Sequence, residues 1–137
     1  MVASWKFDAE AVDVSEPEQV REIAGERVLV LDDAFPIVRD ASAARDLVEA
    51  ALNAEATLIA VPASRLDAEF FRLRSGIAGE ILQKAANYRL KVAVVGDISA
   101  HVAASDALRD FVVECNRGRE IFFVDGITAL EQRLSFG

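Results

Sequence analysis

The amino-acid sequence predicts a single α/β domain with a mixed, mostly parallel β-sheet. Short apolar runs alternate with stretches of helical periodicity, and the first two strand-like segments are separated only by a short loop that contains glycine. Strands that are separated by helices need parallel crossovers within one sheet. A length of 137 residues fits one domain, which can bury enough surface to fold without disulfides or metal.

Residues 1–17 are predicted to form an N-terminal extension or an extra edge strand, because their weak alternation of apolar and polar residues stops at Pro17. The α/β domain itself is expected to span residues 18–137. Residues 19–23 and 27–31 have the composition of two strands. The short loop between them predicts a β-hairpin.

A helix and a buried strand are expected next. Asp40 can cap a helix in which alanine and leucine recur at helical spacing as far as Ala51. Residues 57–61 form a short apolar run that Pro62 stops, which is typical of a strand buried on both faces. This run predicts a central parallel strand.

The following segment fits a helix that starts near Leu66. Ser64–Asp67 has the pattern of a capping box, and the helix would carry Phe70 and Phe71 toward the core. Residues 76–89 continue with one apolar helical face. Whether the glycine at the start of this face divides the segment into two helices is left open by the sequence.

Two more strands and two more helices complete the domain. Residues 91–95 and 120–124 have the apolar composition of buried strands. Between them, Ser105 can start a helix that stops at Gly118. A second capping-box pattern at Thr128 predicts a short terminal helix.

Composition and charge exclude several classes of function. A net charge of −8 and a pI near 4.6 disfavour nucleic acid and anionic membranes as partners. No apolar run approaches the roughly 18 to 20 residues that span a bilayer, and the start lacks a secretory signal, so a soluble cytoplasmic protein is expected. The single cysteine rules out an intramolecular disulfide and a cysteine-rich zinc site. We expect no metal and no cofactor.

Acidic residues follow each strand of the predicted parallel sheet except one. Asp32 and Asp33 resemble the acidic pair of a receiver domain, which also needs a lysine at the end of its last strand, where this chain has Asp125. Together with Asp97, these acids fall at strand carboxyl ends, the edge at which open α/β sheets bind ligands. A hard cation could bind such a set, but solvation of the strand ends explains the acids more simply.

The chain offers few catalytic groups. His101 is the only histidine and is expected to be exposed in a loop, whereas Cys115 is expected to be a small buried residue of its helix. Gly76 and Gly79 form neither a dinucleotide-binding pattern nor a P-loop. The sequence therefore predicts no catalytic residue and favours a protein without enzymatic activity.

The most informative stretch runs from Phe70 to Arg89, where an apolar helical stripe is combined with a serine, two glycines and many polar groups. Gly76 and Gly79 each cost about 1 kcal/mol relative to alanine inside a helix, which suggests that a backbone or a ligand approaches them closely. The polar groups can also be read as a solvated face, in which Glu80 and Lys84 form an i,i+4 pair worth only tenths of a kcal/mol.

A second polar cluster lies around the end of the next helix, where cations suit the helix dipole. The predicted interaction or ligand surface combines the two clusters: Arg72, Ser75, Gly76, Gly79, Glu80, Gln83, Lys84, Asn87, Glu114, Asn116 and Arg117. The alternative hypothesis is a small enzyme or ligand-binding domain that uses the strand carboxyl ends with Glu80, Asn116 and Arg117.

From about residue 20 to residue 134 the chain resembles the bacterial domain-of-unknown-function family 4180, which has no established activity. The resemblance is carried by Phe70-Phe71, Leu73, Ser75–Lys84, Asn87–Arg89, Val92–Asp97, Leu108–Phe111, Glu114 and Asn116–Gly118.

A more distant resemblance is to STAS domains, the fold of anti-sigma-factor antagonists, in which a hairpin also precedes alternating helices and strands. Ser75-Gly76-Ile77 matches the motif that carries a phosphorylatable serine in that family, although Arg74 replaces the usual acidic or serine neighbour and the loop after Val61 is longer. The resemblance implies a regulatory domain without catalysis, controlled at Ser75, whose partner is an unidentified protein or a second copy of the chain.

Overall fold

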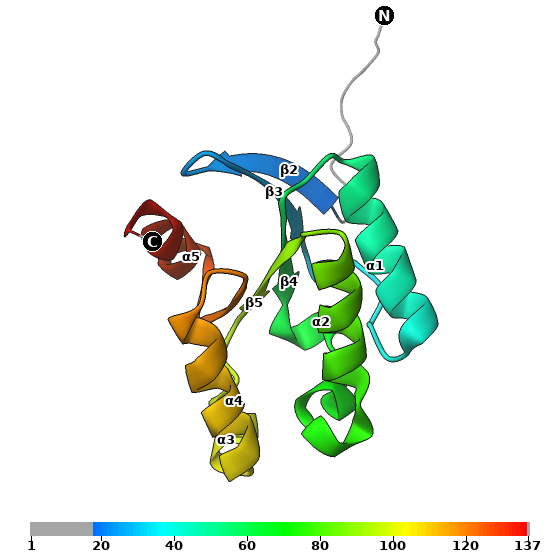
Figure 1. The fold of residues 1–137 in the computed structure, drawn as a ribbon, viewed down its shortest axis with the longest axis vertical. Coiled ribbons are helices and arrows are strands. Elements are labelled where there is room, and N and C mark those ends of the chain that lie inside the picture. The colour runs from blue at the N-terminus through cyan, green and yellow to red at the C-terminus, as the bar shows by residue number, and fades with distance from the viewer. Residues whose placement is uncertain (1–17, 137) are drawn as a thin grey trace, which may run out of the picture.

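The computed structural model describes residues 18–136, so the predicted extension at 1–17 lies outside the described residues. One five-stranded sheet, in the order β2-β3-β4-β5-β6, forms the centre of the domain. Figure 1 shows its strands among the helices. The first pair is antiparallel and the other three pairs are parallel. The strands are β2 (Glu18–Ile23), β3 (Glu26–Leu31), β4 (Leu58–Pro62), β5 (Lys91–Val95) and β6 (Ile121–Val124). The predicted mixed sheet is confirmed.

The hairpin between β2 and β3 has a two-residue loop. Ala24 and Gly25 occupy it with φ values of 51° and 85°. Positive φ at both central positions is typical of the turn whose twist matches that of the flanking strands. The register then pairs Ile23 with Glu26.

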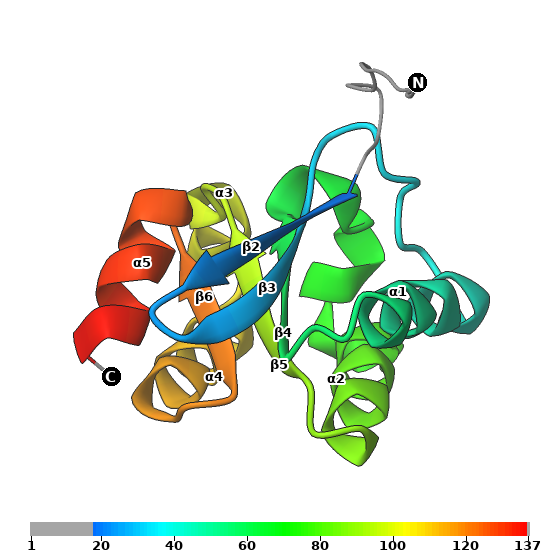
Figure 2. The ribbon, with the colours of Figure 1, turned by 90° about the horizontal axis from the view of Figure 1, so that it is seen from above.

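Helices cover the two faces of the sheet unequally. The crossover helices α1 (Ala41–Asn53), α2 (Ile77–Asn87) and α4 (Asp106–Arg117) pack on the face that carries Leu29, Ile59, Val92 and Val94. The terminal helix α5 (Ile127–Phe136) packs with its Leu130 on the other face, against Val28, Ala60, Ala93 and Phe122. Figure 2 shows α1 and α2 together on one side of the strands and α5 on the other.

The strand order has a consequence for ligand binding. Each parallel strand from β3 to β6 lies next to the preceding one, so the strand order nowhere reverses. Ligand crevices of open α/β sheets form where the order reverses and neighbouring crossovers leave to opposite faces. This sheet lacks such a point among the parallel strands of the described residues.

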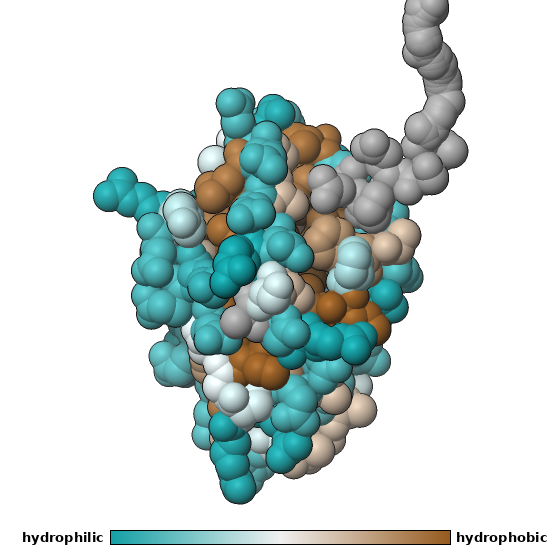
Figure 3. All heavy atoms as spheres, turned by 90° about the vertical axis from the view of Figure 1, so that its right-hand side faces the viewer, coloured by the Kyte–Doolittle hydropathy of each residue, from teal (hydrophilic) through white to brown (hydrophobic). Residues whose placement is uncertain are grey.

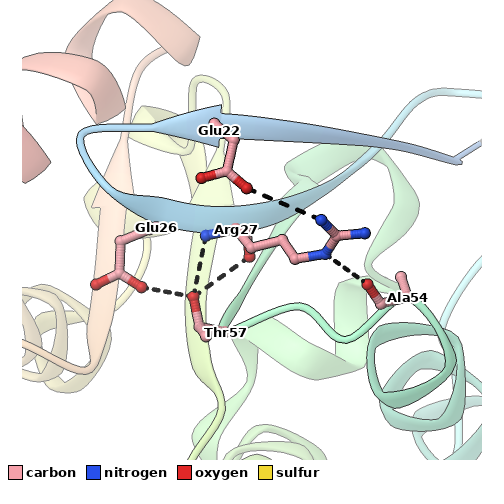
Figure 4. A network of polar contacts seen from close by, with 5 residues as sticks. All are labelled: Glu22, Glu26, Arg27, Ala54 and Thr57. Carbon is pink, nitrogen blue, oxygen red and sulfur yellow. Dashed lines mark hydrogen bonds and ion pairs between the residues drawn. The ribbon is translucent and has the colours of Figure 1, made fainter.

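A polar cluster ties the amino ends of three strands together, and most of it is visible in Figure 4. Thr57 donates a hydrogen bond of 2.6 Å to the carboxylate of Glu26, and its Oγ1 accepts one of 3.2 Å from the backbone of Arg27. Lys91 at the start of β5 forms an ion pair with the same Glu26. The Arg27 guanidinium donates to the carbonyl of Ala54 just after α1, at 2.8 Å.

The prediction of a helix that starts near Leu66 is wrong. The segment consists of three short 3-10 helices, η1 (Ala63–Arg65), η2 (Ala68–Phe71) and η3 (Leu73–Ser75). Leu66 adopts an extended conformation and forms a parallel bridge with Val38, which interrupts any helix at this point. The capping-box serine, Ser64, donates instead to Asp33, at 2.7 Å. The burial of Phe70 and Phe71 is confirmed.

Other local predictions have mixed outcomes. Asp40 and Ser105 cap α1 and α4 as expected. His101 lies in the short helix α3 (Ser99–Ala103) and not in a loop, and α5 begins at Ile127, which places Thr128 inside its first turn. Gly76 has a left-handed backbone, with φ of 80°, and separates η3 from α2. The glycine therefore does divide this segment into two helical parts.

The Glu26 cluster predicts a pH-dependent contribution to stability. Hydrogen bonds from Lys91 and then from Thr57 lower the pKa of Glu26, so folding favours its charged form. This stabilisation is complete above the ordinary glutamate pKa of about 4.3 and is lost as the pH falls through the lower folded-state pKa. Glu26→Gln should lower the free energy of unfolding by about 1 kcal/mol at neutral pH, as measured by urea denaturation.

The difference between the two proteins should shrink as the pH falls below 4, because protonation then removes the same charge from the wild type. Glu49→Gln, on the exposed surface of α1, is the matched control and should change stability little at either pH. An equal loss for Glu26→Gln at neutral and acidic pH would show that charge is not the cause.

Candidate functional site

A groove separates α2 from α4 on the helical face of the sheet. This α2–α4 groove encloses about 470 Å³ and is lined mainly by apolar and small residues, among them Gly76, Gly79, Leu82, Gln83, Phe111 and Ile121. It therefore contains both glycines that the sequence singled out. The opposite wall comes from α4 and β6, which lie more than twenty residues further along the chain.

The two glycines differ in their structural setting. Gly76 is left-handed at the start of α2, a conformation that other residues rarely adopt. Gly79 lies inside α2, and a Cβ atom built on it would meet nothing within 4 Å. No backbone of the described residues therefore approaches Gly79, and its missing side chain leaves space in the groove.

Ser75 lies beside the groove, just before the start of α2. Its hydroxyl donates a hydrogen bond of 2.6 Å to the carbonyl of Glu69 and accepts one of 3.2 Å from the backbone of Ile77. The side chain remains exposed. Arg72, close by in the chain, forms an ion pair of 2.8 Å with Glu69. Ser75 thus joins η2 to the first turn of α2.

The remaining polar residues of α2 form a solvated surface. Glu80 and Lys84 have the spacing of a pair, but no ion pair within 4.0 Å joins them. Gln83 instead donates to Asn87, at 3.0 Å. Of these four residues, Gln83 is the one that lines the groove.

The second predicted cluster, at the end of α4, has a structural role. The Asn116 side chain makes two hydrogen bonds to the backbone of Phe123 in β6, at 2.8 Å and 3.2 Å. Arg133 of α5 donates to the carbonyls of Asn116 and Gly118 and so closes the end of α4. Arg117 forms an exposed ion pair with Glu114, at 2.9 Å. These contacts fasten α4 to β6 and α5.

The structure does not bring the residues of the alternative hypothesis together. Because α4 runs from the carboxyl edge of β5 to the amino edge of β6, Asn116 and Arg117 lie at the amino edge of the sheet. Glu80 lies in the first turn of α2, which begins on the carboxyl side of β4.

Three of the acids at the strand carboxyl ends accept hydrogen bonds from the domain itself. Asp32 and Asp97 each accept a hydrogen bond from the backbone two residues further on, and Asp33 accepts one from Ser64. The bond from the backbone of Ser99 lowers the pKa of Asp97. Within residues 18–136, no group of three or more metal-ligating side chains is placed to hold an ion.

Cys115 and His101 occupy different environments. Cys115 is partly buried, and burial together with the charge of Glu114 raises the pKa of its thiol, which disfavours the nucleophilic thiolate. His101 is exposed, and its ring stacks on that of Phe71, with centroids 4.1 Å apart and an angle of 13° between the planes. No sequence pattern indicates this pair, because Phe71 lies in η2 and His101 in α3.

Within residues 18–136, no helix has both the length and the apolar composition that crossing a membrane requires. The side of the molecule seen in Figure 3 is mainly hydrophilic and has separate apolar patches.

Alanine substitutions at the two glycines of the groove should have opposite effects on the stability of the fold. Gly79→Ala should raise the free energy of unfolding by up to about 1 kcal/mol, because alanine favours the helix and meets open space. Gly76→Ala should lower it by about 1 kcal/mol, because its left-handed backbone strains a side chain. Urea denaturation of both variants measures the difference, and a destabilised Gly79→Ala would mean that the groove is closed in solution.

The comparisons with known proteins give one match. The family model described as a domain of unknown function, DUF4180, matches residues 23–134. No curated protein and no solved structure matches the chain. Since the match covers well over half of its length, the chain belongs to the DUF4180 family.

Proposed function

We propose that this DUF4180 chain is a non-catalytic, STAS-like regulatory domain of the cytoplasm that docks an amphipathic helix of a partner protein in the α2–α4 groove. One observation carries the proposal: the groove is apolar, about 470 Å³ in volume, and open at Gly79. Helix-in-groove recognition places the apolar face of one helix in such a groove.

The shape of the groove favours a helix as the occupant. Packed helices approach to 8–10 Å, and small residues at the contact allow the shorter distances. On its α2 side the groove presents Gly76, just before the helix, and Ala78, Gly79 and Ala86 within it, with the larger Leu82 among them. Phe111 of α4 provides an aromatic side chain on the opposite wall. Gln83 supplies a polar group that can fix the register of the partner.

Ser75 is the proposed control point. It is exposed and lies between Leu73 and Gly76, which both line the groove. Arg72 and Arg74 are near it in the chain. Phosphorylation would remove the proton that the hydroxyl donates to Glu69 and add a charge of about −1.5 to −2 beside these arginines. The new charge would reorganise the turn that forms one end of the groove.

The alternative, a small enzyme or ligand-binding domain built on Glu80, Asn116 and Arg117, has less support. The side chain of Asn116 is already bonded to Phe123, and that of Arg117 to Glu114. Glu80 belongs to a different part of the helical layer. An enzyme would need these groups to converge on one substrate.

Photo-crosslinking tests the docking surface. A photoreactive residue at Gln83, in the groove, should crosslink to a partner protein in cells, and Gly79→Leu should reduce the yield by about tenfold. The leucine fills space that the partner helix needs, whereas in the isolated domain its Cβ atom meets nothing within 4 Å. Mass spectrometry identifies the crosslinked peptide.

Two controls belong to this experiment. A photoreactive residue at Arg45, exposed on α1, should not crosslink to the same partner, and Glu49→Leu adds an equal apolar side chain away from the groove. An unchanged crosslink in folded Gly79→Leu would contradict the proposal. A crosslink to a second copy of the chain would show that the groove serves self-association and does not bind a different protein.

Substitutions of Ser75 test the control point. Ser75→Asp should retain the fold, because aspartate can accept from Ile77 and suits the start of a helix, whereas Ser75→Ala loses both hydrogen bonds and about 1 kcal/mol. If Ser75 controls docking, Ser75→Asp should change the yield of the crosslink from Gln83, whereas Ser75→Ala should leave that yield unchanged. Equal yields from both stable variants would exclude control by charge at Ser75.

A further inference from the structure

A second cavity lies apart from the α2–α4 groove, between the 3-10 turns before α2 and the α3–α4 segment. This Phe71–His101 pocket has a volume of about 640 Å³, and its walls include Phe71, Arg72, Arg74, Ala100, His101 and Ser105. The two walls come from residues 68–74 and 100–107. It shares only Leu73 with the groove.

The charged side chains that line this pocket are basic, although the chain as a whole is acidic. The chain has a net charge of −8, yet the pocket is lined by two arginines and by no aspartate or glutamate. Arg72 is held by its ion pair with Glu69. In the part of the chain from 18 to 136, no carboxylate lies within 4.0 Å of the Arg74 guanidinium. Arginine binds phosphate and carboxylate groups through paired hydrogen bonds.

The rest of the wall is apolar and aromatic. The parallel rings of Phe71 and His101 form one part, and small residues form most of the remainder. These small residues are Ala68, Ala100, Ala104 and Ala107. A volume of 640 Å³ falls within the range of small-molecule sites and far exceeds the need of an inorganic ion.

We infer that the Phe71–His101 pocket binds a small organic anion, with an aromatic group against the apolar wall and a phosphate or carboxylate at Arg72 and Arg74. This site goes beyond the proposed docking function, since it takes another kind of ligand and shares only Leu73 with the groove. Arg72 and Arg74 also lie near Ser75 in the chain. The shared chemistry is a single anionic group joined to a flat ring.

Four probes separate the parts of this ligand: adenosine monophosphate, benzoate, adenosine and inorganic phosphate. Titrations of the full chain are followed by NMR of backbone amides, at ligand concentrations up to about 10 mM, which would fill most of a site with a Kd of 1 mM. At least one of the two organic anions should produce saturable shifts at residues 68–74 and 100–107. Which of them binds distinguishes a phosphate from a carboxylate.

Adenosine and inorganic phosphate should each bind about tenfold more weakly than the best organic anion, because each lacks one half of the recognition. If adenosine binds equally well, charge plays no part and the inference fails. If phosphate alone binds equally well, or if no probe saturates at these amides, the inference also fails.

Variants locate the site. Arg74→Gln should weaken binding of the organic anion by about tenfold, and Ala104→Leu should block it by filling the cavity. Arg45→Gln on α1 removes the same charge elsewhere and should leave binding unchanged, as should Gly79→Leu in the groove. If Arg74→Gln and Arg45→Gln weakened binding of the organic anion equally, the cause would be the net charge of the chain, and the inference would be overturned.

Discussion

The simple strand order of the parallel sheet determines how its helical layer is built. Each new strand from β3 to β6 lies beside the previous one, and the three crossover helices therefore share one face. The carboxyl ends of these strands therefore lack the crevice that opens where the strand order reverses. Both cavities discussed above lie among the helices and the turns that lead into them.

Local sequence signals predicted most of the fold. The hairpin followed from two strand patterns around a glycine turn, and the caps of α1 and α4 followed from Asp40 and Ser105. Prediction failed between β4 and α2, because the bridge between Val38 and Leu66 joins residues 28 positions apart and imposes an extended conformation. A capping pattern in the sequence contains no information about such a partner.

The candidate site was predictable on one wall only. Ser75, Gly76 and Gly79 stood out because a helix does not need them, and the structure places both glycines in a groove. Phe111 and Ile121 read as ordinary core residues in the sequence, and their place opposite Gly79 depends on the packing of α4. Asn116 shows the reverse case: as a polar residue near a helix end it resembled a surface group, but it bonds to β6.

The two hydrogen bonds of Asn116 also make the two edges of the sheet unequal. They occupy the backbone N–H and C=O of Phe123 on the outer side of β6, the groups through which a further strand would attach. β2, at the opposite edge, has no such side-chain cap within residues 18–136. Any growth of the sheet by strand addition, whether in assembly or in aggregation, is therefore directed to one side of the molecule.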